Sequence, residues 1–436
     1  MDKYKNKKIA ILGYGFEGKS LVDFLLKLLP SELVVFDEKN KELDEIHQDE
    51  DVVIKHGLLD DIDFSSFDFV FRSPGIKIEK INCPQDKITS LSNLFFEYKK
   101  GKSVIVTGTK GKSTTVLLIE QILKQNNKKV FVGGNIKLDP LDFVGQLDDE
   151  SYTVLEMSSF QLQDFTGIAD YAVVLPLFPD HLDYHDDARD YYKSKSKAFT
   201  NSDQTVVVSS EENKTILDLE KLANKEIIFS LNKSDTSCYK ERDSIVCSGK
   251  LISEGVENFC KFHKIPTIDF VAAASFAYAE DLVIDIDQLK ESFHKLPFRI
   301  ELVKQKSNVK FFNDSASTNP VSTIAAIDQM HGSTALLLGG SSKGLSFEDL
   351  TDEIVKGNTI SAVYLFGESR AQIEESLRRK GYRGMLRSYK TLSEVIGNLD
   401  LTEVGNVLFS PAFASFDQYE NYTERANEFN TLVKNL

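Results

Sequence analysis

The chain has 436 residues, of which 52 are Lys or Arg and 67 are Asp or Glu, so its formal net charge is −15 at pH 7. This length exceeds what one hydrophobic core supports and predicts about three domains. The negative charge argues against a nucleic-acid partner, and the lack of a long apolar run argues against a membrane partner. Because the start of the chain shows no signal peptide, we expect a soluble, cytoplasmic protein.

Cysteine usage points to the same compartment. Cys83, Cys238, Cys247 and Cys260 form no Cys-x-x-Cys pair, and their spacing suits neither a zinc site nor a disulfide framework. We therefore expect four reduced thiols.

The first elements resemble a nucleotide-binding unit. Residues 8–12 and 32–36 are predicted strands, joined by the loop Gly13-Tyr-Gly15-Phe-Glu-Gly18 and a helix through Leu29. Such a loop binds a nucleotide diphosphate at a helix N-terminus, and taken alone it would suggest an oxidoreductase. Asp37 ends the second strand and is predicted to accept a hydrogen bond from a ribose or base. The alternative is a solvated acid after an edge strand.

A further strand at 67–72 breaks at the turn 73–76, which could close this site, and a helix is predicted around 91–98. A second glycine loop follows a boundary that we place near residue 98. Residues 104–115 read Val-Ile-Val-Thr-Gly-Thr-Lys-Gly-Lys-Ser-Thr-Thr, a strand that ends at a glycine loop before a helix. This order predicts a phosphate cradle in which Lys112 reaches the β- and γ-phosphates and Ser113 coordinates Mg²⁺. The match departs from the strict P-loop pattern, because Val106 occupies the place of its first glycine. A plain glycine turn is the alternative.

Strands and helices alternate in the rest of the chain, which predicts three consecutive α/β domains at 1–98, 99–297 and 298–436. Residues 232–262 are predicted to be irregular or short antiparallel strands, and a small-residue helix is predicted at 270–280. The other predicted strands are 129–132, 152–155, 171–175, 205–208, 226–229, 310–313, 335–338, 362–365 and 407–409.

Metal-binding candidates follow two central strands. Glu156 ends a buried strand, at the edge of the sheet where ligands of α/β proteins bind, and is a natural Mg²⁺ ligand. His181, with Asp180 and Asp183, comes shortly after the next strand. The cluster of Lys193, Lys195 and Lys197 is either a solvated helix face or includes one lysine that points inward, and a buried cation would need an anionic partner.

Three polar loops follow strands of the third domain, at 313–319, 339–344 and 410–417. Because the carboxyl ends of parallel strands share one edge of a sheet, we expect these loops to converge. Their hydroxyls, N–H groups and one lysine could hold a small anionic substrate.

In this order the segments resemble the Mur ligase family over nearly the whole chain. The pattern at 410–429, with Ser415-Phe-Asp-Gln and Arg425-Ala-Asn-Glu-Phe429, is similar to the branch that adds glutamate. The other segments that carry the resemblance are 13–18, 73–76, 107–115, 133–136, 155–162, 180–183, 190–195, 299–301 and 313–319.

The resemblance implies an N-terminal Rossmann-like domain for a UDP group, a central P-loop ATPase and a C-terminal Rossmann-like domain. It implies an ATP-dependent ligase of peptidoglycan precursor synthesis that adds D-glutamate to UDP-N-acetylmuramoyl-L-alanine through an acyl phosphate. It also implies two Mg²⁺ ions, a carbamylated lysine and a monomer.

Roles for particular residues follow from the resemblance. Catalysis is assigned to Lys112, His181 and Lys195, the last as the carbamylated lysine, and Mg²⁺ to Ser113, Glu156, His181 and Lys195. ATP is assigned to Gly108, Thr109, Lys110, Gly111, Lys112, Ser113, Thr114, Arg299 and Asp314. The UDP substrate is assigned to Gly15, Phe16, Asp37, Ser73, Gly75 and Asn135, and glutamate to Thr318, Lys343, Ser415 and Tyr422.

The chain departs from the family pattern at several positions. Ala316 stands where the family usually has Lys, and Lys137 where a glycine is common. The Asn residues expected near adenine around 264–268 are absent, and Lys264, Thr267 and Asp269 occupy that region. Alternative hypotheses are a Mur-like ligase with another acceptor, such as L-glutamate, and a non-catalytic nucleotide-binding relative.

Overall fold

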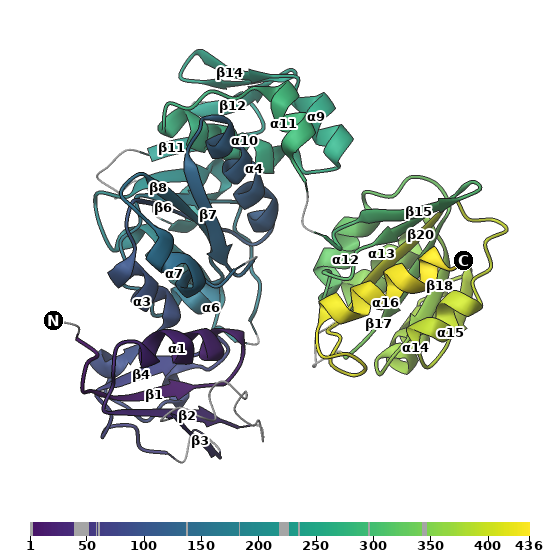
Figure 1. Cartoon of the computed structure of the whole chain (residues 1–436). Helices are drawn as coiled ribbons and strands as arrows, with labels where there is room; N and C mark the ends of the chain where they lie inside the picture. Colours follow the sequence, from purple (N-terminus) through teal and green to yellow (C-terminus); the bar gives the residue numbers. More distant parts are fainter. Residues whose placement is uncertain are drawn as a thin grey trace. The chain divides into compact units, whose positions relative to one another are not determined.

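The computed structural model describes residues 3–38, 52–57, 59, 62–136, 138–182, 184–217, 226–233, 236–294, 297–341 and 347–436. The chain divides into two compact units, Met1–His294 and Lys295–Leu436. In the described part of the chain the first unit contains two sheets and the second contains one, and each sheet is mostly parallel with helices against it (Figure 1). The predicted α/β class with three successive sheets is confirmed.

The N-terminal sheet has the strand order β3-β2-β1-β4-β5, and its strands are parallel. Side chains alternate along β1: Ile9 and Ile11 face a core shared with α1 and α3, while Ala10 and Leu12 face the opposite core. Its elements are β1 (Lys8–Leu12), α1 (Phe16–Leu26), β2 (Glu32–Asp37), β3 (Val52–His56), β4 (Phe69–Arg72), β5 (Ile88–Thr89) and α3 (Leu91–Tyr98).

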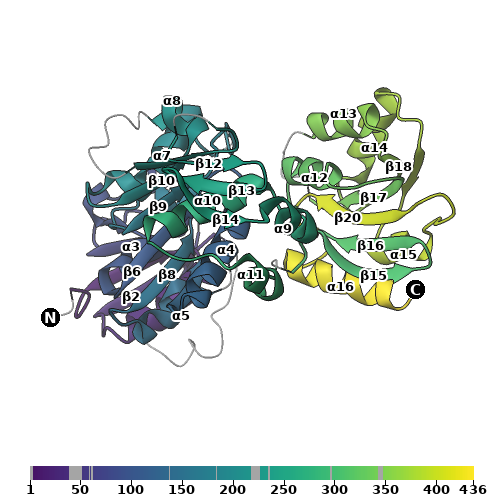
Figure 2. The ribbon, with the colours of Figure 1, turned by 90° about the horizontal axis from the view of Figure 1, so that it is seen from above.

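The central sheet has the order β14-β13-β12-β11-β10-β9-β6-β8-β7, in which only the hairpins β12–β13 and β13–β14 are antiparallel among the described strands. Helix α4 packs on β7 and β8, and α10 packs beside it on β10 and β11 (Figures 1 and 2). The elements are β6 (Lys102–Thr107), α4 (Lys112–Gln125), β7 (Lys129–Gly134), α5 (Pro140–Phe143), β8 (Ser151–Glu156), α6 (Ser159–Leu162), β9 (Tyr171–Val174), α7 (Ala188–Thr200), β10 (Val206–Ser210), α8 (Lys214–Leu217), β11 (Glu226–Ser230), β12 (Cys238–Glu241), β13 (Ser244–Cys247), β14 (Lys250–Glu254), α9 (Val256–His263), α10 (Thr267–Ala279) and α11 (Ile286–Ser292).

One hydrophobic core joins the first two sheets. It runs from Ile11 on β1 and Leu25 on α1 through Phe95 on α3 to Phe143 and Leu155 of the central sheet. Because this apolar surface is continuous, residues 1–98 and the central sheet form one compact unit. The division of that unit near residue 98 into two domains stays a prediction.

The second unit is one sheet of order β15-β16-β20-β17-β18-β19, parallel except for the β15–β16 pair among the described strands. Leu336 and Leu338 of β17 face one core, and Ala335 and Leu337 face the other. The elements are β15 (Glu301–Lys306), β16 (Val309–Asn313), α12 (Pro320–Ile327), β17 (Thr334–Gly339), α13 (Glu348–Lys356), β18 (Ile360–Phe366), α14 (Arg370–Arg379), β19 (Met385–Ser388), α15 (Leu392–Gly397), β20 (Asn406–Ala412) and α16 (Tyr422–Lys434).

Two expectations are corrected or extended here. The expectation of four reduced thiols is wrong for one pair, because β12 and β13 place Cys238 opposite Cys247 and the two form a disulfide. Cys83 and Cys260 are free thiols. The segment 232–262 holds the antiparallel strands that were expected, and it also holds helix α9. No helix in the described part of the chain is long and apolar enough to cross a membrane.

Candidate active site

The glycine loop between β6 and α4 has the backbone that a phosphate cradle requires. Gly108 and Gly111 adopt φ values of +150° and +84°, a region that residues with a side chain rarely adopt. A Cβ at Gly108 would lie 2.5 Å from the Cβ of Leu175, and one at Gly111 would lie 2.2 Å from Oδ1 of Asp269. Both glycines are therefore required by the fold of the loop, as a phosphate cradle and a plain glycine turn would both demand.

Lys112 is the first residue of α4, and its side chain folds back over the loop. Its Nζ donates to the carbonyl oxygens of Gly108 and Thr109, both at 3.0 Å. Gly111 is the N-cap and has no side chain to cap the first turn of α4. The N–H groups of that turn and the helix dipole therefore favour an anion at this end.

Ser113 and Glu156 meet beside this loop, at the ends of α4 and β8. The Ser113 hydroxyl donates to Oε2 of Glu156 at 2.6 Å, and Asn135 Nδ2 donates to Oε1 at 3.3 Å. Both Ser113 and Glu156 are buried. Hydroxyl, carboxylate and amide oxygens suit Mg²⁺, which prefers oxygen ligands and retains water or phosphate oxygens as the others.

The described residues contain no group of three His, Cys, Asp or Glu side chains arranged to hold a metal. A cation beside Glu156 would therefore depend on mixed ligands, with phosphate oxygens among them. This donor set fits a nucleotide-bound Mg²⁺ better than a structural metal site.

Lys195 is the inward member of the lysine cluster on α7. It is 2% exposed, and its Nζ donates to Gly108 O at 3.0 Å and Thr107 Oγ1 at 3.3 Å. Burial, followed by the nearby charge of Lys112, lowers the pKa of Lys195 well below its usual value. Lys193 is exposed, and Lys197 is half-buried against the Gln163 carbonyl.

Tyr191 connects three of the predicted site residues. Its hydroxyl hydrogen-bonds the Thr109 hydroxyl at 2.9 Å, and its ring lies 4.9 Å from Nζ of Lys195. The ring of the partly exposed His181 lies 6.4 Å from the Tyr191 ring, centroid to centroid. His181 has φ of +54°, a strained conformation that holds its ring between Phe160 and Tyr191. Asp183 lies outside the described residues.

The sequence did not single out His185 or Arg72, and both are buried beside this site. His185 accepts or donates at both nitrogens, 2.8 Å from Asp190 Oδ2 and 2.9 Å from Ser159 Oγ. Arg72 ends β4 and pairs with Asp164. Asp164 lies 92 positions from Arg72 and Ser159 lies 26 positions from His185, so no local motif signals these two contacts.

The N-terminal glycine loop is held by Asp37, whose Oδ2 accepts from the backbone N–H of Tyr14 at 2.7 Å. Asp37 is 7% exposed, and β2 lies inside the sheet, so the solvated-edge alternative is wrong. A Cβ would meet nothing within 4 Å at Gly15 or Gly75. Phe16 is 66% exposed. Gly15, Phe16 and Gly75 therefore each border open space.

In the second unit, Asp314 follows β16 and is buried. It accepts from the Ser410 hydroxyl at 2.6 Å and from the backbone N–H of Ile300 at 3.2 Å. Burial raises its pKa to about 6, against the opposing effects of these hydrogen bonds and the charge of Arg299. Arg299 itself is exposed.

The polar loops of this unit lie at neighbouring strand ends, because β20 pairs with both β16 and β17. Ser315 Oγ donates to the Tyr422 carbonyl, and Arg425 donates to Ser315 and to the Phe413 carbonyl. Thr318 and the buried Ser415 lie on two of these loops. Lys343, like Lys137, lies outside the described residues.

Comparison with known proteins agrees with this arrangement. Residues 106–262 match the Mur ligase middle domain. The chain is 30% identical to the UDP-N-acetylmuramoylalanine--D-glutamate ligase of Clostridium perfringens and 31% identical to that of Clostridium tetani. Each alignment covers 99% of this chain and 97% of the relative.

Two solved structures share the fold. The UDP-N-acetylmuramate-alanine ligase MurC of Thermotoga maritima aligns with a TM-score of 0.61 at 16% identity, over 98% of this chain and 99% of that one. The MurF ligase of Thermotoga maritima, in complex with ADP, aligns with a TM-score of 0.59 at 18% identity over the whole of both chains. Since the sequence similarity extends through all three sheets, this chain belongs to the Mur ligase family.

Proposed function

We propose that the chain is an ATP-dependent ligase that joins D-glutamate to UDP-N-acetylmuramoyl-L-alanine in peptidoglycan precursor synthesis. The observation that carries this proposal is full-length similarity to ligases of that name, together with a phosphate loop placed beside the Ser113–Glu156 pair. A cytoplasmic location is part of the proposal, since ATP and a nucleotide-linked substrate are cytoplasmic compounds. A monomeric state is proposed as well.

The reaction requires ATP because a carboxylate is a poor electrophile. A carboxylate oxygen of the alanyl group attacks the γ-phosphorus, the bond to ADP breaks, and an acyl phosphate forms. The amine of D-glutamate then attacks the acyl carbon, loses a proton and expels phosphate, which leaves an amide. Lys112 and the N–H groups at the start of α4 neutralise and orient the phosphates.

Ser113 and Glu156 would hold Mg²⁺, with His181 and a modified Lys195 as the proposed further ligands and two ions in total. Bound Mg²⁺ supplies charge neutralisation at the transferred phosphoryl group. The buried oxygen pair at 2.6 Å supports the assignment of Ser113 and Glu156.

We propose that Lys195 is carbamylated. The lone pair of its neutral amine attacks CO₂, a N–C bond forms and one proton leaves, so that the neutral amine becomes a carbamate anion. Burial favours the neutral amine that this reaction needs. The modification would also place an anion beside Lys112, whose positive charge it would attract.

The remaining assignments extend the same proposal. The open surface at Gly15, Phe16 and Gly75, with Asp37 and Ser73, is proposed to take the UDP group, and Asn135 the muramoyl group. Thr318, Lys343, Ser415 and Tyr422 are proposed to bind D-glutamate, and Arg299 and Asp314 to contact ATP.

Ala316 supports a second candidate, in which the acceptor is another acid such as L-glutamate. Its backbone N–H donates to the Phe298 carbonyl, and its methyl side chain offers no positive charge to a carboxylate. The choice between the acceptors is open to a direct assay.

Phosphate release from ATP tests the proposal. It is measured with UDP-N-acetylmuramoyl-L-alanine and, in turn, D-glutamate, L-glutamate or D-aspartate. We expect stimulation by D-glutamate. Stimulation only by L-glutamate or D-aspartate would support the second candidate, and no stimulation by any of the three would reject the ligase.

A further inference from the structure

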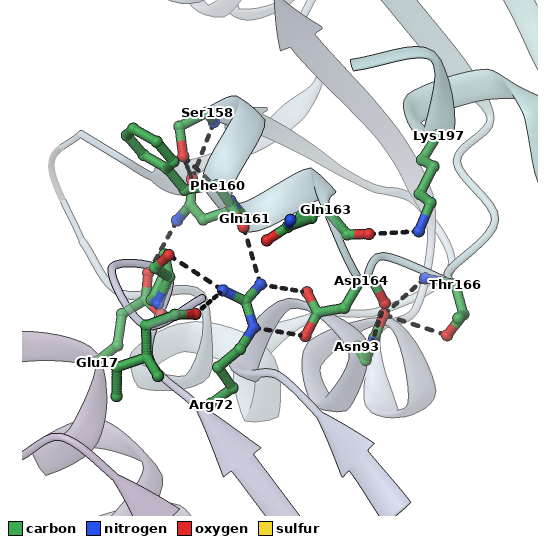
Figure 3. Close-up of polar contacts among 12 residues, drawn as sticks. Glu17, Arg72, Asn93, Ser158, Phe160, Gln161, Gln163, Asp164, Thr166 and Lys197 are labelled. Carbon is green, nitrogen blue, oxygen red and sulfur yellow. Dashed lines mark hydrogen bonds and ion pairs between the residues drawn. The ribbon is translucent and has the colours of Figure 1, made fainter. Parts of the chain in front are cut away.

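Arg72 is a fully buried cation whose contacts extend beyond one ion pair. It is 1% exposed, and its guanidinium forms a two-point contact with Asp164, from Nη2 to Oδ1 at 2.8 Å and from Nε to Oδ2 at 3.2 Å (Figure 3). Asp164 belongs to the segment after α6, 92 positions away in the chain. The pair therefore connects the N-terminal sheet to the central one.

The other guanidinium nitrogen, Nη1, donates hydrogen bonds to the turn 73–76. Nη1 donates to the carbonyls of Pro74 at 3.1 Å and Ile76 at 2.8 Å. The hydroxyl oxygen of Tyr184 accepts from Nη1 at 3.2 Å and lies within hydrogen-bond distance of the same two carbonyls, at 3.1 Å and 3.3 Å. Since both carbonyls point inward, the outer side of the turn is left open at Gly75.

The turn 73–76 also packs against the N-terminal glycine loop. A Cβ at Gly13 would lie 2.7 Å from Ser73 Oγ, so the loop and turn are in close contact. The position of the turn against the loop therefore depends on the hydrogen bonds from Arg72 to the turn carbonyls. We expect this position to determine the shape of the proposed UDP site.

Arg72 also holds α6, which follows the metal-binding end of β8. Nη2 donates to the Phe160 carbonyl at 2.9 Å. A second contact reaches α6, because Gln161 Nε2 donates to Glu17 in the first turn of α1 at 2.9 Å and Gln161 Oε1 accepts from the N–H of Ser158 (Figure 3). Ser158 lies two residues after Glu156. The turn 73–76, through Arg72, and α1, through Glu17, are thus both hydrogen-bonded to α6.

A structural ion pair alone would not require this arrangement. Buried ion pairs contribute little net stability, because the cost of desolvating both charges offsets their attraction. A guanidinium with acceptors on all three nitrogens, by contrast, specifies the relative positions of the groups that it joins.

We infer that Arg72 is a positioning residue of the ligase, which fixes the distance between the turn 73–76 and α6 so that the nucleotide-linked substrate binds with its carboxylate toward the Ser113–Glu156 pair. The inference rests on the proposed function. It adds a residue that does not contact the substrate but determines the shape of the site where the substrate binds.

The decisive variant replaces the pair, Arg72→Met with Asp164→Leu, so that no buried charge is left alone. Apolar replacement of a buried ion pair commonly preserves stability. We expect thermal unfolding near that of the unmodified protein, a KM for UDP-N-acetylmuramoyl-L-alanine raised about tenfold to a hundredfold, and a KM for ATP changed by less than about twofold. Calorimetric titration with the UDP substrate, without ATP, should show the same loss of affinity.

Two further variants keep the test informative if the double variant does not fold. Arg72→Lys retains the charge but loses the planar set of guanidinium donors, and it should raise the KM for the UDP substrate. Tyr184→Phe should raise this KM less. Lys99→Met is the matched control, because Lys99 pairs with Asp170 at 3.2 Å at the far end of β6, and it should leave both KM values unchanged.

The inference is overturned if Arg72→Lys and the double variant bind the UDP substrate as the unmodified protein does. It is also overturned if the KM values for ATP and the UDP substrate rise together with a loss of thermal stability. An unmodified protein that releases no phosphate with any acceptor would instead reject the proposed function, so the two failures are distinguishable.

Discussion

Glu17 provides the sharpest prediction about stability. Burial raises the pKa of its carboxyl from 4.5 to about 7, although the hydrogen bond from Gln161 opposes the shift. The nearby carboxylates of Asp139 and Asp164 raise it further, and Arg72 lowers it. The folded protein therefore binds this proton more tightly than the unfolded chain does.

The sign of the pH dependence follows from this difference. The contribution of Glu17 to the free energy of unfolding is greatest below pH 4.5, falls as the pH rises toward 7, and is lost above 7. Each pKa unit is worth about 1.4 kcal/mol, so the loss is at most roughly 3 kcal/mol.

Glu17→Gln removes the ionisation and retains an oxygen that accepts from Gln161. We expect the variant to match the unmodified protein near pH 4.5 and to be more stable at pH 8, by about 1 to 3 kcal/mol. Urea unfolding followed by circular dichroism measures this, and Glu79→Gln, at an exposed position, is the control. A variant that is less stable than the unmodified protein at pH 8, or that matches the unmodified protein at both pH values, would refute the reasoning.

Three other changes test the site. Lys112→Ala should lower kcat/KM for phosphate release by about a hundredfold or more with the fold intact, measured beside Lys124→Ala; full turnover would contradict the phosphate-loop assignment. Removing CO₂ from the buffer should lower the activity, bicarbonate should restore it, and Lys195→Met should abolish this response; activity indifferent to CO₂ would exclude the carbamate. Asp314→Asn should make the stability of the second unit less dependent on pH between 3.8 and about 6, where stability otherwise falls as pH rises, checked by urea unfolding at pH 4 and 7.

The sequence predicted those parts of the site that depend on local patterns. The loop at 108–111 and the end of β8 at Glu156 were recognisable because glycine spacing and strand ends are written in consecutive residues. The residues alone left the inward cation open among three lysines, since only the packing of α7 on the central sheet decides which one is buried, and the family resemblance assigned it to Lys195.

Other features depend on pairing across the fold and could not be predicted in this way. Arg72 finds Asp164 on a distant segment, and Cys238 meets Cys247 only because of the register between β12 and β13. Strand β15 was missed because Glu301–Lys306 is largely polar and lies at a sheet edge, where hydrophobic alternation is weak. The strands β3 and β19 were also missed; both lie at sheet edges and have only five and four residues, too few for a clear alternation.

The central claim is that the γ-phosphoryl group of ATP passes to a substrate carboxylate. UDP-N-acetylmuramoyl-L-alanine labelled with ¹⁸O in both carboxylate oxygens tests it directly, with mass spectrometry of the phosphate released in the presence of D-glutamate. If the acyl phosphate forms, each phosphate carries one ¹⁸O atom and the amide product retains the other. Phosphate without ¹⁸O, released in step with product, would contradict the account.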